Sequence, residues 1–229
     1  MYIITHEAVP QSYIIDRVIS QLGDDIVSVL EEDEIKDGIC FALSLEWVRR
    51  VALGDVDTAI RLNEKGFVDS NDALYKQIAA NFFHYSVNTG MSSVVNRFIS
   101  FVIGLSKKLK VADPDMELAG IPEIYQWYVD ACSRSSLKTD MFFDQLTADD
   151  FRIHFEKKFD GNPGVYLVGS SNHQMAFACI ERDRHREILF YEPNCGVCRS
   201  DSIKGVVNYF KYGFPRNERF DICNVVKNE

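Results

Sequence analysis

Three residue types that can act together in nucleophilic catalysis occur in the order Cys40, His173 and Glu192. A cysteine nucleophile needs a base to accept its proton, and the base needs a group that orients its ring. Cys40 lies in the segment DGICFALSLEW, in which Asp-Gly indicates a turn and the following residues indicate an apolar helix over 39–53. The unpaired N–H groups of a first helical turn favour a thiolate and can hold an oxyanion. The segment therefore predicts a reactive thiol at a helix start.

His173 is the candidate base among the five histidines of the chain. It follows GSSN and opens a predicted strand over 173–181, so it lies where a strand meets a loop, a common place for functional residues. The other four lie near the N-terminus, in predicted helices or in a charged turn, and we interpret them as surface or helix-end residues: His6, His84, His154 and His185.

A predicted β-hairpin with its turn at residues 183–184 brings His173 close to Glu192. In that register His173 falls opposite Asn194, and Glu192 is its diagonal neighbour on the same face. Diagonal side chains lie ~7 Å apart, within reach of a Glu and a His. A slip of one residue would move Glu192 to the other face, so the predicted contact depends on the turn.

Each of the three residues also has a structural interpretation. Free cysteines are among the most buried residues, so Cys40 could be a packing residue. His173 could be a hydrogen-bonded residue at a strand end, and Glu192 a surface acid before a proline. The three together, in this order, favour the catalytic interpretation.

Three blocks of the chain resemble those of the YopT-type cysteine protease effectors of bacterial pathogens and symbionts, a family with a papain-like fold. The block NHQMAFA, residues 172–178, resembles the family's histidine block, and FYEPNCG, residues 190–196, resembles its Asp-Pro-Asn-aromatic-Gly block. The first block matches Gly-x-Cys-x-(Ala/Gly)-Leu-Ser-x-x-Trp through Gly38, Cys40, Ala42, Leu43, Ser44 and Trp47.

The resemblance implies a cysteine peptidase without a cofactor, in which Cys40 is the nucleophile, His173 the base and Glu192 the orienting carboxylate. The family has Asp where this chain has Glu192, and Asn194 is an alternative orienting group. Papain-like enzymes also place an oxyanion-binding amide about six residues before the cysteine, where this chain has Glu34. The backbone N–H of Cys40 is expected to serve as one oxyanion donor.

The resemblance further implies a virulence effector that cleaves a host signalling protein. Such an effector is made in the bacterial cytoplasm and secreted into the host cell without a cleaved signal peptide. The net charge of −9 argues against a nucleic-acid partner, because phosphates require a basic face, and suits a protein substrate with a basic segment. The apolar runs are shorter than a membrane span, so we expect no stable membrane insertion.

The order of predicted elements indicates an α+β protein with a papain-like fold, a helical lobe packed on an antiparallel β-sheet lobe. We expect one domain over 1–229, with a helical lobe at about 37–160 and a sheet lobe at about 161–229. Residues 1–36 are expected to be an N-terminal extension or a pro-segment. The helices are predicted at 11–31 with a break near Gly23, 39–53, 70–84, 91–109, 121–132, 147–158 and 201–211, and the strands at 165–169, 173–181, 186–192 and 219–226.

Other functions share part of this evidence. The same triad supports an acyltransferase or a deamidase, and an inactive papain-like scaffold could serve as a binding module. Cys195-x-x-Cys198 could form a redox pair. A zinc site would add Cys179 and His173, but no second pair of ligands has the required spacing, so no metal site is expected.

Overall fold

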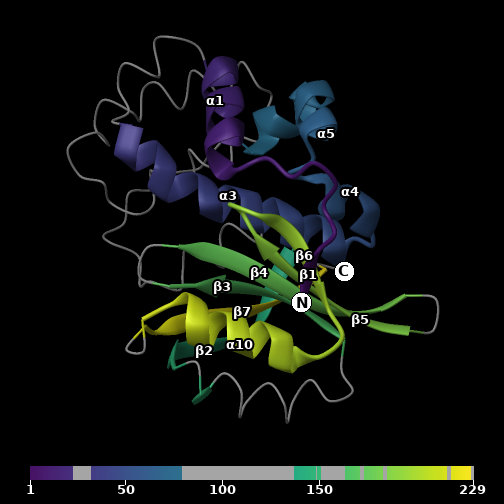
Figure 1. Ribbon diagram of the computed structural model, residues 1–229, viewed down its shortest axis with the longest axis vertical. Coiled ribbons are helices and arrows are strands. Elements are labelled where there is room, and N and C mark those ends of the chain that lie inside the picture. The colour runs from purple at the N-terminus through teal and green to yellow at the C-terminus, as the bar shows by residue number, and fades with distance from the viewer. Residues whose placement is uncertain are drawn as a thin grey trace.

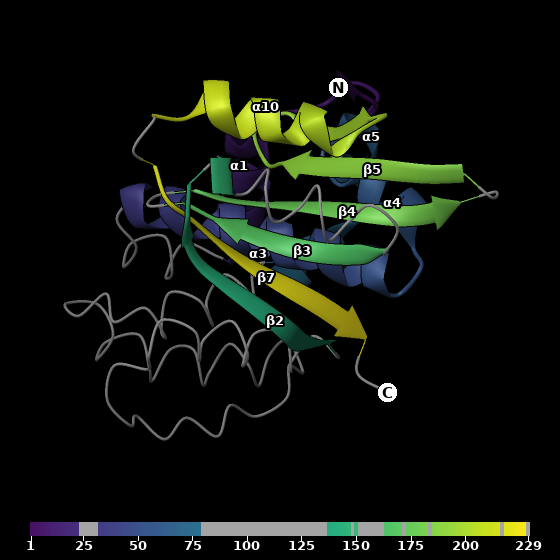
Figure 2. The ribbon, with the colours of Figure 1, turned by 90° about the horizontal axis from the view of Figure 1, so that it is seen from below.

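The computed structural model describes residues 1–22, 32–78, 137–147, 149–150, 163–170, 173–182, 185–215 and 218–227. In these residues the strands form one antiparallel sheet of order β1-β6-β5-β4-β3-β7-β2, and Figures 1 and 2 show its arrangement. The helices are α1 (Gln11–Leu22), α3 (Glu32–Ala52), α4 (Val56–Arg61), α5 (Lys65–Ser70) and α10 (Ile203–Gly213). The strands are β1 (Tyr2–Ile3), β2 (Leu137–Leu146), β3 (Gly164–Gly169), β4 (Gln174–Arg182), β5 (His185–Glu192), β6 (Gly196–Ser200) and β7 (Phe220–Lys227).

Helices cover both faces of the sheet, with α3 and α10 on opposite sides (Figure 1). Strand β4 shows the alternation that this requires. Its Ala176 and Ala178 belong to the apolar cluster around α3. Phe177 and Cys179 belong to the cluster around α10. The α+β architecture expected from the sequence is therefore confirmed, with α10 as a second helical layer.

The four predicted strands between residues 165 and 226 are confirmed, each end to within one residue. The first predicted helix ends at Leu22 as α1, before the expected break at Gly23, and the last one is α10. Strand β2 belongs to the sheet although it lies within the segment expected to form the helical lobe. The predicted helices at 91–109 and 121–132 lie outside the described residues, and those at 70–84 and 147–158 are described only in part, with residues 72–78 helical.

Helix α3 starts earlier than predicted, at Glu32 rather than near residue 39. Cys40 follows that first residue by eight positions and therefore lies in the helix interior. Gly38 was interpreted as part of a turn, but a helical glycine costs only about 1 kcal/mol relative to Ala. Burial of every residue from 39 to 48 on the sheet outweighs this cost.

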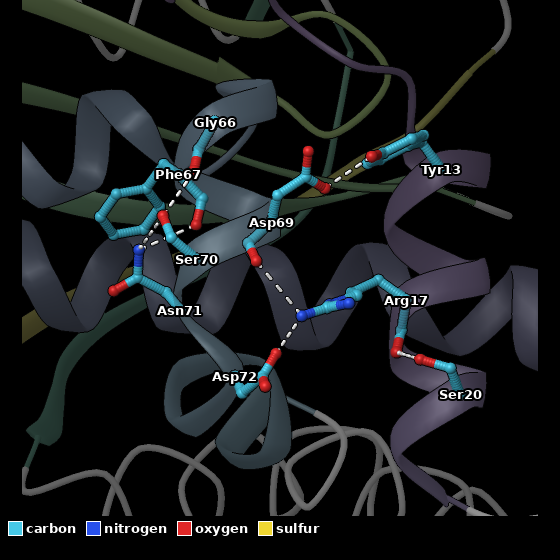
Figure 3. Close-up of polar contacts among 9 residues, drawn as sticks. All are labelled: Tyr13, Arg17, Ser20, Gly66, Phe67, Asp69, Ser70, Asn71 and Asp72. Atoms are coloured by element: carbon cyan, nitrogen blue, oxygen red, sulfur yellow. Dashed lines mark hydrogen bonds and ion pairs between the residues drawn. The ribbon is translucent and has the colours of Figure 1, made fainter.

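Helix α1 is held against α5 and against Asp72, two residues beyond the end of α5, by polar contacts that Figure 3 shows. The Tyr13 hydroxyl donates to Asp69 Oδ1 at 2.6 Å, and Arg17 donates to the Asp69 carbonyl at 3.3 Å and pairs with Asp72. Ile14 and Ile15 of α1 are buried in the core. The N-terminal residues thus contribute to packing, and the removal of residues 1–36 as a pro-segment stays a prediction.

Residues 2–9 form an N-terminal strap that crosses from the sheet to the helices. Ile3 pairs with Cys198 on β6, and the Thr5 hydroxyl donates to the Ile60 carbonyl and accepts from the Val197 N–H, both at 2.8 Å. The Val9 N–H donates to the Asn63 carbonyl at 2.7 Å. The strap therefore connects the start of β6 with the loop between α4 and α5.

Candidate active site

The hairpin of β4 and β5 brings His173 and Glu192 together as predicted. Ladder pairs such as Ala176 with Tyr191 confirm the predicted register. His173 immediately precedes β4, and Glu192 is the last residue of β5, so both lie at the same end of the hairpin. His173 Nε2 lies 2.6 Å from Glu192 Oε1, and the two side chains are only 18% and 6% exposed.

Cys40 reaches the same imidazole from α3. Its thiol is hydrogen-bonded to the His173 side chain, and the residue is 3% exposed. Each ring nitrogen has one in-plane hydrogen-bonding position, and Glu192 occupies that of Nε2, which leaves Nδ1 for the thiol. The structure thus brings together the three residues that the sequence singled out.

The surroundings of His173 stabilise its protonated form. Burial lowers the pKa of the imidazole. The hydrogen bonds to Cys40 and Glu192, together with the charges of these groups, outweigh the effect of burial and raise the pKa to about 9. Burial also raises the pKa of Glu192, but the hydrogen bond and charge of His173 hold it below its usual value. At neutral pH the arrangement is therefore an imidazolium beside a carboxylate, with the Cys40 sulfur on the other side of the ring.

Donors from the following turn hold the Glu192 carboxylate. The backbone N–H and the side-chain amide of Asn194 both lie 3.2 Å from Glu192 Oε1, and the Cys195 thiol is also hydrogen-bonded to this carboxylate. Asn194 was predicted as an alternative to Glu192 for orienting the histidine. In the structure Glu192 contacts the imidazole, and Asn194 donates to the same carboxylate oxygen.

The turn after Glu192 closes at Gly196, which has φ of +85°. A side chain is disfavoured at this backbone angle, and an added Cβ would lie 2.8 Å from Thr5 Oγ1. The turn and the N-terminal strap therefore pack too closely for any residue but glycine. This contact connects the strap to the segment that carries the carboxylate.

Two residues of α3 attach it to the strands that carry His173 and Glu192. Ser44 Oγ donates to the Gln174 carbonyl at 3.1 Å, and the Trp47 ring stacks on Tyr191 with centroids 5.7 Å apart. They follow Cys40 by four and seven positions, so all three share one face of the helix. Ser44 and Trp47 were noted only as motif matches, although a serine in a wholly apolar stretch signals a buried hydrogen bond.

The predicted oxyanion donors at a helix start are wrong for this structure. Because Cys40 lies inside α3, its N–H is directed at the carbonyl of Lys36 in the helical hydrogen-bond pattern. Glu34, which occupies the position of the oxyanion amide in papain-like enzymes, also lies within α3. The wrong oxyanion donors and the wrong start of the helix have the same cause, namely the interpretation of Asp37-Gly38 as a turn.

The rival cysteine pair lacks the features of a redox site. Cys195 lies in the turn after β5 and Cys198 within β6, so neither lies at a helix N-terminus. Burial and the charge of Glu192 raise the pKa of Cys195 to about 11 and also raise that of Cys198. A redox-active cysteine needs a lowered pKa. Across the described part of the chain, no group of three or more His, Cys, Asp or Glu side chains could hold a metal ion.

A helix that carries a cysteine and packs on an antiparallel sheet that carries a histidine and a carboxylate is the arrangement of a papain-like α+β fold. The fold class expected from the sequence is present. Within the described residues, no helix has the length and apolar character needed to cross a membrane.

Solved structures similar to this chain include an avirulence protein, a viral ubiquitin-specific protease and a cysteine protease-like toxin domain. The Pseudomonas avirulence protein AvrPphB matches with a TM-score of 0.47 and 14% identity over 85% of this chain and 94% of its own. The ubiquitin-specific protease of murine cytomegalovirus tegument protein M48 has a TM-score of 0.41 and 11% identity, over 82% of this chain and 77% of its own. PatoxP, a cysteine protease-like domain of the Photorhabdus asymbiotica toxin PaTox, has a TM-score of 0.31 and 12% identity, over 94% of this chain and 87% of its own.

No protein-family model matches the sequence, and no curated protein matches it. At identities of 14% and lower, no residue role is transferred from the three structures to this chain. The roles considered below depend on the contacts of Cys40, His173 and Glu192.

Proposed function

We propose that this protein is a cysteine peptidase that cleaves a protein substrate with Cys40, His173 and Glu192. The observation that carries the proposal is the position of one imidazole between a thiol and a carboxylate, with Glu192 Oε1 2.6 Å from His173 Nε2. The proposed base is thereby in contact with both the proposed nucleophile and the proposed orienting group, as covalent catalysis requires.

The reaction follows from these contacts. The Cys40 sulfur, as thiolate, attacks the substrate carbonyl carbon and forms a C–S bond. The protonated His173 then gives its proton to the departing amine, the C–N bond breaks, and a thioester remains on Cys40. His173 next takes a proton from water, the hydroxide attacks the thioester, and the acid product leaves as the thiolate re-forms. Glu192 keeps the ring oriented and balances its positive charge in both steps.

The substrate and the biological setting belong to the same proposal. The resemblance of the blocks around Cys40, His173 and Glu192 supports a YopT-type virulence effector that acts on a host signalling protein. The chain's charge of −9 suits a substrate segment rich in Lys and Arg. Delivery from the bacterial cytoplasm into the host cell would need no cleaved signal peptide.

The first test is the alkylation of Cys40 by iodoacetamide as a function of pH, read by peptide mass. We expect Cys40 to react below pH 6 in the wild type and to lose this reactivity in His173→Ala. The exposed Cys195 serves as an internal control, since its raised pKa predicts slow reaction there. If Cys40 reacts only like an ordinary thiol while Cys195 and Cys198 react first, the peptidase proposal fails.

The second test identifies the acyl acceptor. Wild-type protein and Cys40→Ala are incubated with a library of peptides that contain basic segments, and new N-termini are labelled and sequenced. New N-termini that depend on Cys40 support hydrolysis. Modified amines or deamidated glutamines without new N-termini would replace the peptidase with an acyltransferase or a deamidase that uses the same triad.

A further inference from the structure

Asn63 is a fully buried amide that stands outside every motif found in the sequence. It lies in the loop between α4 and α5 and is 0% exposed. Its Nδ2 donates to the Pro193 carbonyl at 2.8 Å and to the Val9 carbonyl at 3.1 Å, and its Oδ1 accepts from the Tyr191 hydroxyl at 2.8 Å. A buried amide with this many partners has one orientation only.

Two of these three partners flank Glu192 in the sequence. Tyr191 precedes the carboxylate and Pro193 follows it, so one side chain holds the chain on both sides of Glu192. The Tyr191 ring is held as well by its stack on Trp47. Burial raises the pKa of Tyr191 well above its usual value, so its hydroxyl remains a donor throughout the working pH range.

The Glu192 carboxylate needs support because the residue at this position is a glutamate. A glutamate side chain has one more rotatable bond than an aspartate, so its carboxylate is less well defined by the backbone. Asn194 and Cys195 bind the carboxylate directly, but they belong to the same turn and move with it. Asn63 comes from a different part of the chain, 130 residues from Pro193, and can fix the turn relative to the loop between α4 and α5.

We propose that Asn63 is the positioning residue of this site, which holds the Tyr191–Pro193 segment so that the Glu192 carboxylate meets His173. Asn63 touches neither substrate nor the reacting atoms and acts through Glu192. The third bond, to Val9, ties the N-terminal strap to the same amide. The inference rests on the proposed triad, because only there does the Glu192–His173 contact have a catalytic purpose.

The test is the titration of His173 in the full chain, followed by NMR of its imidazole protons. We expect Asn63→Ala to lower the titration midpoint by about 1 pH unit, since a carboxylate that moves away stabilises the imidazolium less. The matched control is Tyr75→Phe. It removes another buried hydrogen bond in the same corner, from the Tyr75 hydroxyl to the Leu62 carbonyl at 2.7 Å, and should leave the midpoint unchanged.

A double substitution separates positioning from general destabilisation. In a Glu192→Gln background Asn63→Ala should no longer shift the His173 midpoint, because its effect acts through the carboxylate. Equal shifts with and without Glu192 would overturn the proposal, as would a folded Asn63→Ala protein with the wild-type midpoint.

If Asn63→Ala does not fold, Tyr191→Phe decides the question. It keeps the ring stack on Trp47 and removes one of the three bonds to Asn63, so a smaller shift in the same direction supports the proposal and no shift overturns it. A wild-type midpoint at the ordinary histidine value near 6.5 would instead contradict the proposed triad itself. An unchanged midpoint in the variants, with a raised one in the wild type, contradicts only the role of Asn63.

Discussion

The two sides of the sheet are built from different kinds of buried side chain. The side that contains α3 includes Ser44, Glu46, Asn63 and Gln174, each no more than 6% exposed. The Glu46 carboxylate, for example, is 0% exposed and accepts three 2.7 Å hydrogen bonds from two arginines, Arg49 and Arg50. Packing on this side depends on the direction of specific hydrogen bonds.

The side that contains α10 is dominated by aromatic rings. Phe210 is 1% exposed, and its ring centroid lies 5.6 Å from that of Phe190 and 4.8 Å from that of Phe220. Apolar burial is nondirectional and depends on area. The comparison teaches that the α10 side stabilises the sheet, whereas the α3 side aligns groups on it. Substitutions on the two sides should therefore affect different measurements.

The largest effect is expected from Glu192→Gln. The amide keeps the shape but loses the charge, so kcat/KM should fall by roughly 10⁴-fold, as in other triads. The pKa of His173 should drop from about 9, because the carboxylate is one of the groups that raise it. Peptide cleavage as a function of pH measures both effects. Activity within tenfold of the wild type would show that Glu192 is not the orienting group.

The next largest effect is expected from Phe210→Ala on the α10 side. The free energy of unfolding should fall by about 3–5 kcal/mol, since a large buried ring is lost. Urea unfolding measures this. Tyr212→Ala, on the same helix but 77% exposed, should change stability by less than about 0.5 kcal/mol. The His173 titration of folded Phe210→Ala should match the wild type, and a clear shift would break the proposed division between the two sides.

The pH dependence of stability tests the α3 side without a substrate. Because the folded pKa of His173 is about 9 and the ordinary value is 6.5, its contribution is fully present below pH 6.5 and is lost as the pH rises to 9. We expect the free energy of unfolding to fall by about 3 kcal/mol across that range. His173→Gln should lack this component. The difference between the two curves isolates it, and parallel curves would contradict the raised pKa.

The smallest effect is expected from Ser44→Ala. Loss of its hydrogen bond to the Gln174 carbonyl should cost about 1 kcal/mol of stability and lower kcat/KM several-fold. The control is Ser20→Ala, which removes an exposed bond to the Arg17 carbonyl on α1 and should have almost no effect. Equal effects of the two substitutions would show that Ser44 does not help to align the site.

The sequence alone determined the hairpin and its register. The strands of β4 and β5 are bounded by local turn residues and carry strong apolar runs, so their ends and their pairing follow from short-range chemistry. That register is sufficient to place His173 beside Glu192. The block of residues around Cys40 is likewise local, and it predicts Cys40 as the nucleophile.

Tertiary structure decided what local patterns could not. The start of α3 depends on burial against the sheet, which overrides the local cost of Gly38. Strands β1 and β6 pair residues almost 200 positions apart, and neither was predicted. Asn63 reaches Pro193 across 130 residues. Such contacts exist only once distant segments have packed together. The sequence therefore predicts the candidate reacting groups, but only the folded chain determines how they are held.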